Sequence, residues 1–149
     1  MKKTSSGFTI VELLIVIVVI GILAAITIVA YNGIQQRARD ADRVNDMSSL
    51  KKALALFYAE KGYYPAVNDM TNLTFRRDTL KIPEGIVIPP GTTSTISYTW
   101  ANSPSQYGYV GTAAPGGSFD CGTAGEQCVG YRISYRLESD ATTMITMTN

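Results

Sequence analysis

The chain has 149 residues, of which 46% are hydrophobic and 17% charged, with 13 basic and 12 acidic side chains and no histidine. The length suits one compact domain. Without histidine the chain lacks the commonest general base and the commonest nitrogen ligand for zinc or iron, which argues against most hydrolases and transition-metal sites. A net charge of +1 gives no overall attraction to nucleic acid, so we expect no constitutive nucleic-acid binding.

The hydrophobic residues are concentrated near the amino terminus. Four residues interrupt the apolar run from Phe8 to Tyr31, namely Thr9, Glu12, Gly21 and Thr27. As a helix, the part from Leu13 to Ala30 would span about 27 Å, close to the thickness of the hydrocarbon core of a bilayer. This segment can therefore cross a membrane.

A cleavable secretory signal is the plain alternative, since Lys2 and Lys3 supply a basic start. The apolar run is longer than the usual signal core, however, and no Ala-x-Ala cleavage site follows it. Glu12 also lies near the start of the run, where an ionisable side chain is costly unless it has a partner or reaches the headgroup level.

Residues 2–12 read Lys-Lys-Thr-Ser-Ser-Gly-Phe-Thr-Ile-Val-Glu and are followed by an aliphatic run. This sequence closely resembles the class III signal of type IV prepilins and type II secretion pseudopilins. The resemblance implies cleavage between Gly7 and Phe8 and N-methylation of Phe8. It also implies that Glu12 pairs with the terminal amine of a neighbouring subunit during assembly.

The spacing of Phe8 and Glu12 gives this pairing a physical basis. Residues four apart on a helix share a face, so a new amine and a carboxylate would lie close together on each subunit. Orientation comes from the resemblance. Counted alone, Arg37, Arg39 and Arg43 would instead place the carboxyl-terminal part in the cytoplasm by the positive-inside rule.

Beyond Tyr31 an amphipathic helical pattern continues to Lys61. The apolar positions recur at spacings of three and four: Ile34, Ala38, Ala41, Val44, Met47, Leu50, Leu54, Phe57 and Tyr58. We expect the polar side chains between them to be solvated or to contact packed subunits: Arg39, Asp42, Arg43, Asp46, Lys51 and Lys52. Gly62 and Pro65 end the helix, which we expect to run from about Phe8 to Lys61. Asn32-Gly33 is its weak point, because glycine costs about 1 kcal/mol relative to alanine.

The remaining chain predicts a small β structure. Residues 66–90 read as a long connecting loop with a short helix or turn. Four segments then have strand character, at 95–100, 106–111, 131–137 and 142–148. We expect antiparallel strands that pack on the apolar stripe of the helix. The fold class is therefore α+β, with a long amino-terminal helix against a small antiparallel sheet, which is the pilin fold.

Cys121 and Cys128 are too few for a structural zinc site without histidine, which leaves a disulfide or two free thiols. Many pilins carry a disulfide near the carboxyl end that bounds a surface loop, and the resemblance implies that these two cysteines form one. No EF-hand spacing is present, so we expect neither a metal nor another cofactor.

The resemblance implies four regions: a cleaved leader (1–7), a transmembrane and assembly half of the helix (8–31), an amphipathic half (32–62) and a globular part (63–149). The function it implies is that of a structural subunit of a type IV pilus, not an enzyme. Identical or related subunits, a prepilin peptidase, an inner-membrane platform protein and an assembly ATPase would be its partners. It would lie in the inner membrane before assembly and in an extracellular filament afterwards.

Two alternatives remain open from the sequence. One is a pseudopilin of a type II secretion system, or a subunit of a competence pilus, because the amino-terminal motif does not separate these from a pilin. The other is a membrane-tethered enzyme or binding protein, although no nucleophile-elbow, phosphate-loop or paired-carboxylate motif accompanies its serine and acidic residues.

Overall fold

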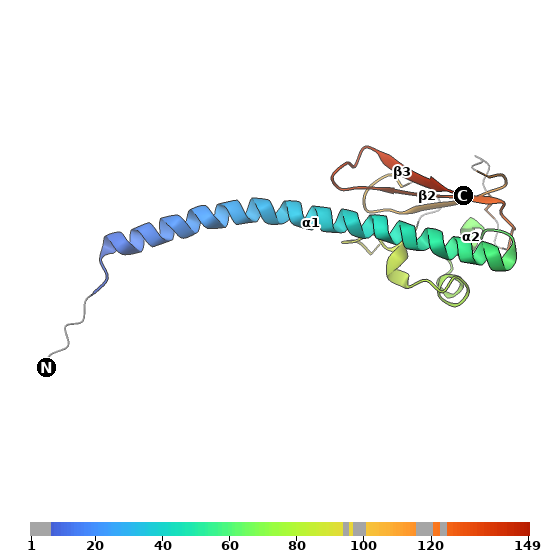
Figure 1. Ribbon diagram of the computed structural model, residues 1–149, viewed down its shortest axis with the longest axis horizontal. Helices are drawn as coiled ribbons and strands as arrows, with labels where there is room; N and C mark the ends of the chain where they lie inside the picture. The colour runs from blue at the N-terminus through green and yellow to red at the C-terminus, as the bar shows by residue number, and fades with distance from the viewer. Residues whose placement is uncertain (1–6, 94–95, 97–100, 116–120, 123–124) are drawn as a thin grey trace. The chain divides into compact units, whose positions relative to one another are not determined.

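The computed structural model describes residues 7–93, 96, 101–115, 121–122 and 125–149 (Figure 1). Residue contacts divide the chain into two compact units, Met1–Gln36 and Arg37–Asn149. We call them the amino-terminal unit and the folded unit. Helix α1 (Ile10–Lys61) contributes to both.

Helix α1 begins two residues later than the sequence predicts and ends where it predicts. At the start, Thr9 precedes the first helical turn and caps it through Glu12. At the end, Gly62 has a φ of 79° and its N–H donates to the carbonyl of Tyr58 at 2.7 Å. This left-handed residue ends the helix at low cost because glycine has no Cβ.

The sheet has three antiparallel strands in the order β1-β2-β3, with β1 at Gly108–Thr112, β2 at Gly130–Arg136 and β3 at Met144–Thr148. Tyr109 lies opposite Ile133, which in turn lies opposite Met147. These strands confirm three of the four predicted segments to within two residues. The fourth, at 95–100, lies outside the described residues except for Ile96.

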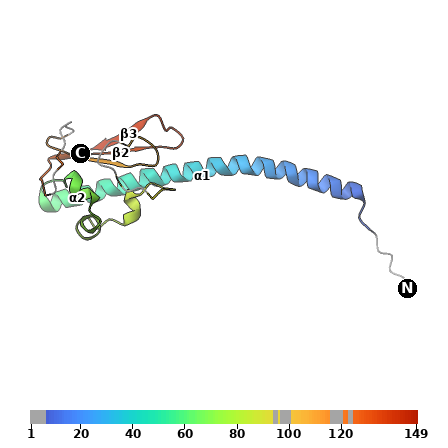
Figure 2. The same ribbon diagram turned by 180° about the vertical axis from the view of Figure 1, so that it is seen from behind.

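The core of the folded unit lies between α1 and the sheet, as the amphipathic pattern predicts. From α1 it contains Met47, Leu50, Leu54 and Phe57, and from the sheet Tyr109, Tyr131, Ile133 and Tyr135. The predicted apolar stripe is wrong at its ends, because Ile34, Val44 and Tyr58 are exposed, as are Ala38 and Ala41. Figure 2 shows the strands on one side of this part of α1 and the connection that follows α2 on the other.

The connection between α1 and the sheet is more helical than predicted. It contains α2 (Val67–Thr71), a π-helical turn η1 (Phe75–Thr79) and a 3-10 turn η2 (Glu84–Val87). These short turns lack the repeated apolar period that reveals a long helix. A side chain marks the start of η1, since Asn72 Oδ1 accepts the N–H groups of Thr74 and Phe75 at 2.9 and 3.2 Å.

A disulfide joins Cys121 to Cys128, with their Cα atoms 5.8 Å apart and both side chains buried. Cys128 exchanges two backbone hydrogen bonds with Tyr64, at 2.8 and 3.2 Å, just beyond the end of α1. Cys121 donates its N–H to the carbonyl of Gly111 in β1 at 2.9 Å. The disulfide therefore fastens the end of α1 to the edge of the sheet.

Gly111 and Gly85 provide a matched test of this packing. A Cβ on Gly111 would lie 2.7 Å from the sulfur of Cys128 and 3.0 Å from the carbonyl oxygen of Pro65, whereas one on Gly85 would meet nothing within 4 Å. We expect Gly111→Ala to lower the free energy of unfolding by about 1–3 kcal/mol through overpacking. Gly85→Ala should change it little or raise it by about 0.4–1 kcal/mol. Urea unfolding of the full chain in detergent, followed by near-ultraviolet circular dichroism, measures both; equal effects would contradict the packing argument.

Candidate functional site

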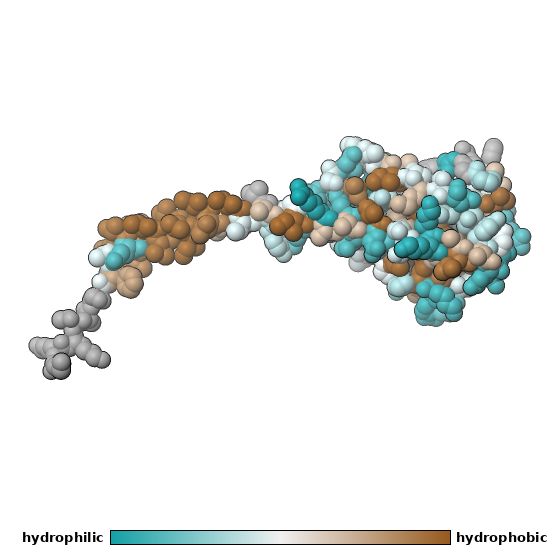
Figure 3. All heavy atoms as spheres, in the orientation of Figure 1, coloured by the Kyte–Doolittle hydropathy of each residue, from teal (hydrophilic) through white to brown (hydrophobic). Residues whose placement is uncertain are grey.

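The amino-terminal unit carries an unburied apolar surface. The described large apolar side chains from Phe8 to Ile34 are 48–83% exposed. An 18-residue window of α1 has a mean hydropathy of 3.3, and none of it is buried. Figure 3 shows this stretch as an almost continuous hydrophobic surface. By length and composition it can cross a membrane, and exposed apolar patches of this extent mark membrane or protein contacts.

Glu12 is the only charged residue of this apolar run, and its carboxylate is bound within its own chain. Oε2 accepts the backbone N–H of Thr9 at 2.8 Å and the Thr9 hydroxyl at 2.7 Å. In return, the N–H of Glu12 donates to Thr9 Oγ1 at 3.2 Å. This reciprocal arrangement is a capping box, and it satisfies amide donors that would otherwise lack partners at the start of a helix.

The predicted processing residues lie immediately before this cap. Gly7 and Phe8 precede α1, and the Phe8 side chain is 83% exposed. A Cβ on Gly7 would meet nothing within 4 Å. Because α1 begins at Ile10, the structure does not place Phe8 on the helical face of Glu12. Lys2 and Lys3 of the predicted leader lie outside the described residues.

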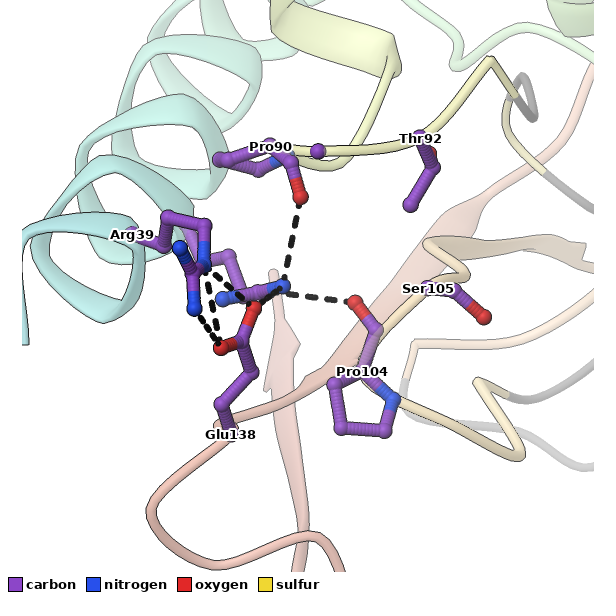
Figure 4. Close-up of a pocket in the computed structure, with 8 residues that line it drawn as sticks. Arg39, Pro90, Thr92, Pro104, Ser105 and Glu138 are labelled. Atoms are coloured by element: carbon purple, nitrogen blue, oxygen red, sulfur yellow. Dashed lines mark hydrogen bonds and ion pairs between the residues drawn. The ribbon is translucent and has the colours of Figure 1, made fainter. Parts of the chain in front are cut away.

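A group of charged side chains joins the first turns of α1 in the folded unit to the residues after β2, and Figure 4 shows Arg39 and Glu138 pointing toward each other. We call Arg39, Asp40, Arg43 and Glu138 the polar cluster. Arg39 donates from Nε and Nη2 to the Glu138 carboxylate at 2.7–3.0 Å, which is a bidentate pair. Asp40 accepts the backbone N–H groups of Glu138 and Ser139 at 2.7 and 3.1 Å.

Arg43 is the most buried member of the cluster, with only 1% of its surface exposed. Its guanidinium donates to Glu138 at 2.6 Å and to Asp40 at 3.2 Å. It also donates to the carbonyls of Pro104 and Pro90, at 3.1 and 3.5 Å. A single side chain of α1 thus binds three segments that are far apart in the sequence.

Beside the cluster lies a cavity of about 430 Å³, whose other walls are Pro90, Gly91, Thr92, Pro104 and Ser105. The cluster pairs two arginines with two carboxylates, so it presents no net charge to a ligand. Within the part of the chain that the structure describes, no three acidic or cysteine side chains lie together as a metal site would require. The sequence prediction of no cofactor stays a prediction.

The sequence analysis placed Arg39, Arg43 and Asp46 on a solvated or subunit-contacting face, and this was wrong for Arg43. Asp46 is also engaged, because it accepts the Tyr107 hydroxyl at 2.9 Å. A signal was present: residues 40 and 43 continue, at spacings of three and four, the buried line of Met47, Leu50 and Leu54. A prediction from side-chain polarity alone therefore placed Arg43 on the wrong face of the helix.

Because the polar cluster contains an ionised carboxylate bound by two arginines, we expect the stability of the folded unit to fall in acid. Hydrogen bonds from Arg39, and then from Arg43, hold the pKa of Glu138 below its ordinary value, while partial burial opposes this shift. The ionised carboxylate therefore stabilises the fold above its unfolded pKa of about 4.3, and this contribution is lost as pH falls through the lower native pKa. We expect Glu138→Gln to cost roughly 1–3 kcal/mol at pH 6. The difference in unfolding free energy between the wild type and the variant, measured by urea unfolding, should be smaller at pH 3. An equal difference at both pH values would exclude Glu138 ionisation as its source.

Comparison with known proteins gives a family match at the amino terminus and a similar protein over most of the chain. Residues 2–28 match the family model described as the prokaryotic N-terminal methylation motif. The chain is 31% identical over 129 residues to the fimbrial protein EcpC of Eikenella corrodens, covering 86% of this chain and 84% of that protein. No solved structure gives a significant match.

Shorter matches cover less than half of this chain and of the related proteins. The type IV major pilin protein PilE of Neisseria gonorrhoeae is 35% identical over 68 residues, covering 46% of this chain and 41% of PilE. The type II secretion system core protein G of Aeromonas hydrophila is 34% identical over 64 residues, covering 43% of this chain and 45% of that protein. The chain carries a methylation motif, has a long helix whose second half packs on a small antiparallel sheet, and is similar to a fimbrial protein over most of its length. It therefore belongs to the family of type IV pilins and related pseudopilins.

Proposed function

We propose that this chain is the structural subunit of a type IV pilus filament. It is made as a prepilin, cleaved between Gly7 and Phe8, N-methylated at Phe8 and polymerised through its apolar helix. The observation that carries this proposal is the similarity to a fimbrial protein over 129 residues, or 86% of the chain, which is too long to be confined to the amino-terminal unit.

The exposed apolar surface of α1 supports residence in the inner membrane before assembly. Each Leu, Ile, Phe or Val at the centre of a spanning helix favours insertion by about 0.3–0.6 kcal/mol. Lipid tails are as apolar as these side chains, so moving the helix from the bilayer into a filament gains little from burial alone. Polymerisation therefore needs a contribution that the membrane does not provide.

Glu12 supplies that contribution in our proposal. An ionised carboxylate at the centre of a spanning helix costs about 2.5–3.5 kcal/mol, and less near the headgroups. In the precursor, Thr9 holds the carboxylate in the capping box. Cleavage would convert the backbone nitrogen of Phe8 into a cationic amine. The amine of one subunit could then neutralise Glu12 of its neighbour, which favours docking at the base of the filament.

The proposed pathway requires several partners. A prepilin peptidase would remove residues 1–7, and an inner-membrane platform protein with a cytoplasmic ATPase would drive extraction from the membrane. Residues 8–31 would span the membrane and then pack against identical or related subunits. Residues 32–62 would continue the helix, and the part from residue 63 would be displayed on the filament surface.

A pseudopilin is the second candidate, favoured by the 34% identity to a type II secretion core protein G. That match covers 43% of the chain, whereas the match to the fimbrial protein covers 86%. The amino-terminal chemistry would be the same in both cases. What differs is the product, because a pilin gives long surface fibres whereas a pseudopilin serves secretion.

Cleavage is tested by the intact mass of the protein extracted from membranes. We expect a loss that matches residues 1–7, together with the gain of one methyl group. Gly7→Val should leave the chain at full length, and since a Cβ at Gly7 meets nothing within 4 Å, misfolding would not explain this result. A full-length wild-type chain, or a cut after Ala25, would contradict the proposal.

Assembly is tested by Glu12→Ala, Glu12→Gln and the exposed control Glu60→Gln, each as the sole subunit. Gln can still form a capping box but carries no charge. We expect both Glu12 variants to be cleaved normally but to yield at least about tenfold fewer fibres in electron micrographs of sheared surface material, which corresponds to roughly 1.4 kcal/mol. Glu60→Gln should assemble like the wild type. Normal yield from Glu12→Gln would rule out an essential charge pair, and absence of wild-type fibres alongside a secretion defect would favour the pseudopilin.

A further inference from the structure

Helix α1 passes through a stretch in which apolar packing does not hold it. Among its described side chains, Met47 is the first buried apolar residue. Between Arg37 and Asp46 the only buried side chains are Asp40 and Arg43, both members of the polar cluster. The apolar residues of this stretch, Ala38, Ala41 and Val44, all face solvent.

The segment just before this stretch is the weakest part of the helix. Asn32 and Gly33 are poor helix formers, and a Cβ on Gly33 would meet nothing within 4 Å. The hydrogen bonds recorded for side chains here stay within the helix, such as Gln35 to Tyr31 at 2.8 Å. A helix without tertiary contacts is only marginally stable in water. Local opening should therefore start in this segment.

We propose that the polar cluster is a boundary clamp, which stops any opening of α1 that begins around Asn32-Gly33 from entering the folded unit. Opening beyond Arg39 would break its bidentate pair with Glu138. The next turn would also lose the two backbone donors bound by Asp40 and the four acceptors bound by Arg43. Glu138 accepts from both arginines, so one carboxylate links these two turns of the helix.

The burial of Arg43 should make opening of α1 stop sharply at the polar cluster. Arg43 is 1% exposed, so withdrawing it leaves the carbonyls of Pro90 and Pro104 without their cationic donor in a partly closed site. Unpaired polar groups in such a site are costly. The amino-terminal unit can then change its surroundings or its conformation while the core from Met47 onward stays packed. This inference goes beyond the proposed function and does not depend on filament formation.

Amide hydrogen exchange of the full chain in detergent micelles tests the clamp. Glu138→Gln removes the charged acceptor of both arginines but keeps the shape of the side chain. We expect exchange of amides 37–45 to accelerate by about tenfold or more. Amides 47–57 and those of β2 should stay protected at labelling times too short for global unfolding, although the lower stability of the variant speeds their exchange at longer times. Asp78→Asn is the matched control, because it makes the same charge change in the exposed pair with Arg77 and should alter neither region.

Three results would overturn the clamp. Unchanged exchange at 37–45 would show that the cluster does not hold the helix. Equal loss of protection at 37–45, 47–57 and β2 at those short labelling times would show that the cluster serves global stability and not a boundary. The same effect from Asp78→Asn would show a nonspecific charge effect. If Glu138→Gln loses β2 protection altogether, Arg39→Gln gives the same readout, since Arg39 is 36% exposed and its loss leaves Arg43 bound to Glu138.

Discussion

The large apolar surface of the amino-terminal unit is the constraint on which the rest of this molecule depends. Side chains from Phe8 to Ile34 that are about half to four-fifths exposed cannot remain in water without association. Lipid or another protein surface has to cover them. Thr9 binds the Glu12 carboxylate at the first turn, so on the proposed function the precursor could be inserted without a partner for Glu12.

Different forces hold the two parts of α1. The first part offers a mainly apolar surface to its surroundings. The second part is held first by the charged hydrogen bonds that Arg39 and Arg43 donate to Glu138. From Met47 onward it is held by apolar packing. A buried arginine is poor evidence for added stability, but its many acceptors fix the helix in one position relative to the strands.

The sequence predicted the features that have a strong local signal. The apolar run, the glycine that ends α1 and three of the strands follow from period, composition and turn residues. The burial of Arg43 did not, because a polar side chain is assigned to solvent unless its tertiary partners are known, and Glu138 lies 95 residues away. The turns at 75–79 and 84–87 were not predicted as helical segments, since each is only four or five residues long, which is too short to produce a period. Cleavage and the role of Glu12 remain predictions.

The peptide bond between Gly7 and Phe8 lies one residue before Thr9, the residue that caps α1 and binds Glu12. As long as that bond is intact, the nitrogen of Phe8 is an amide, which carries no charge at neutral pH and cannot balance a carboxylate. Hydrolysis would change this neutral group into a cation. On the proposed function, uncleaved subunits can accumulate in the bilayer in an inert form, and each becomes competent for assembly only after an irreversible covalent step.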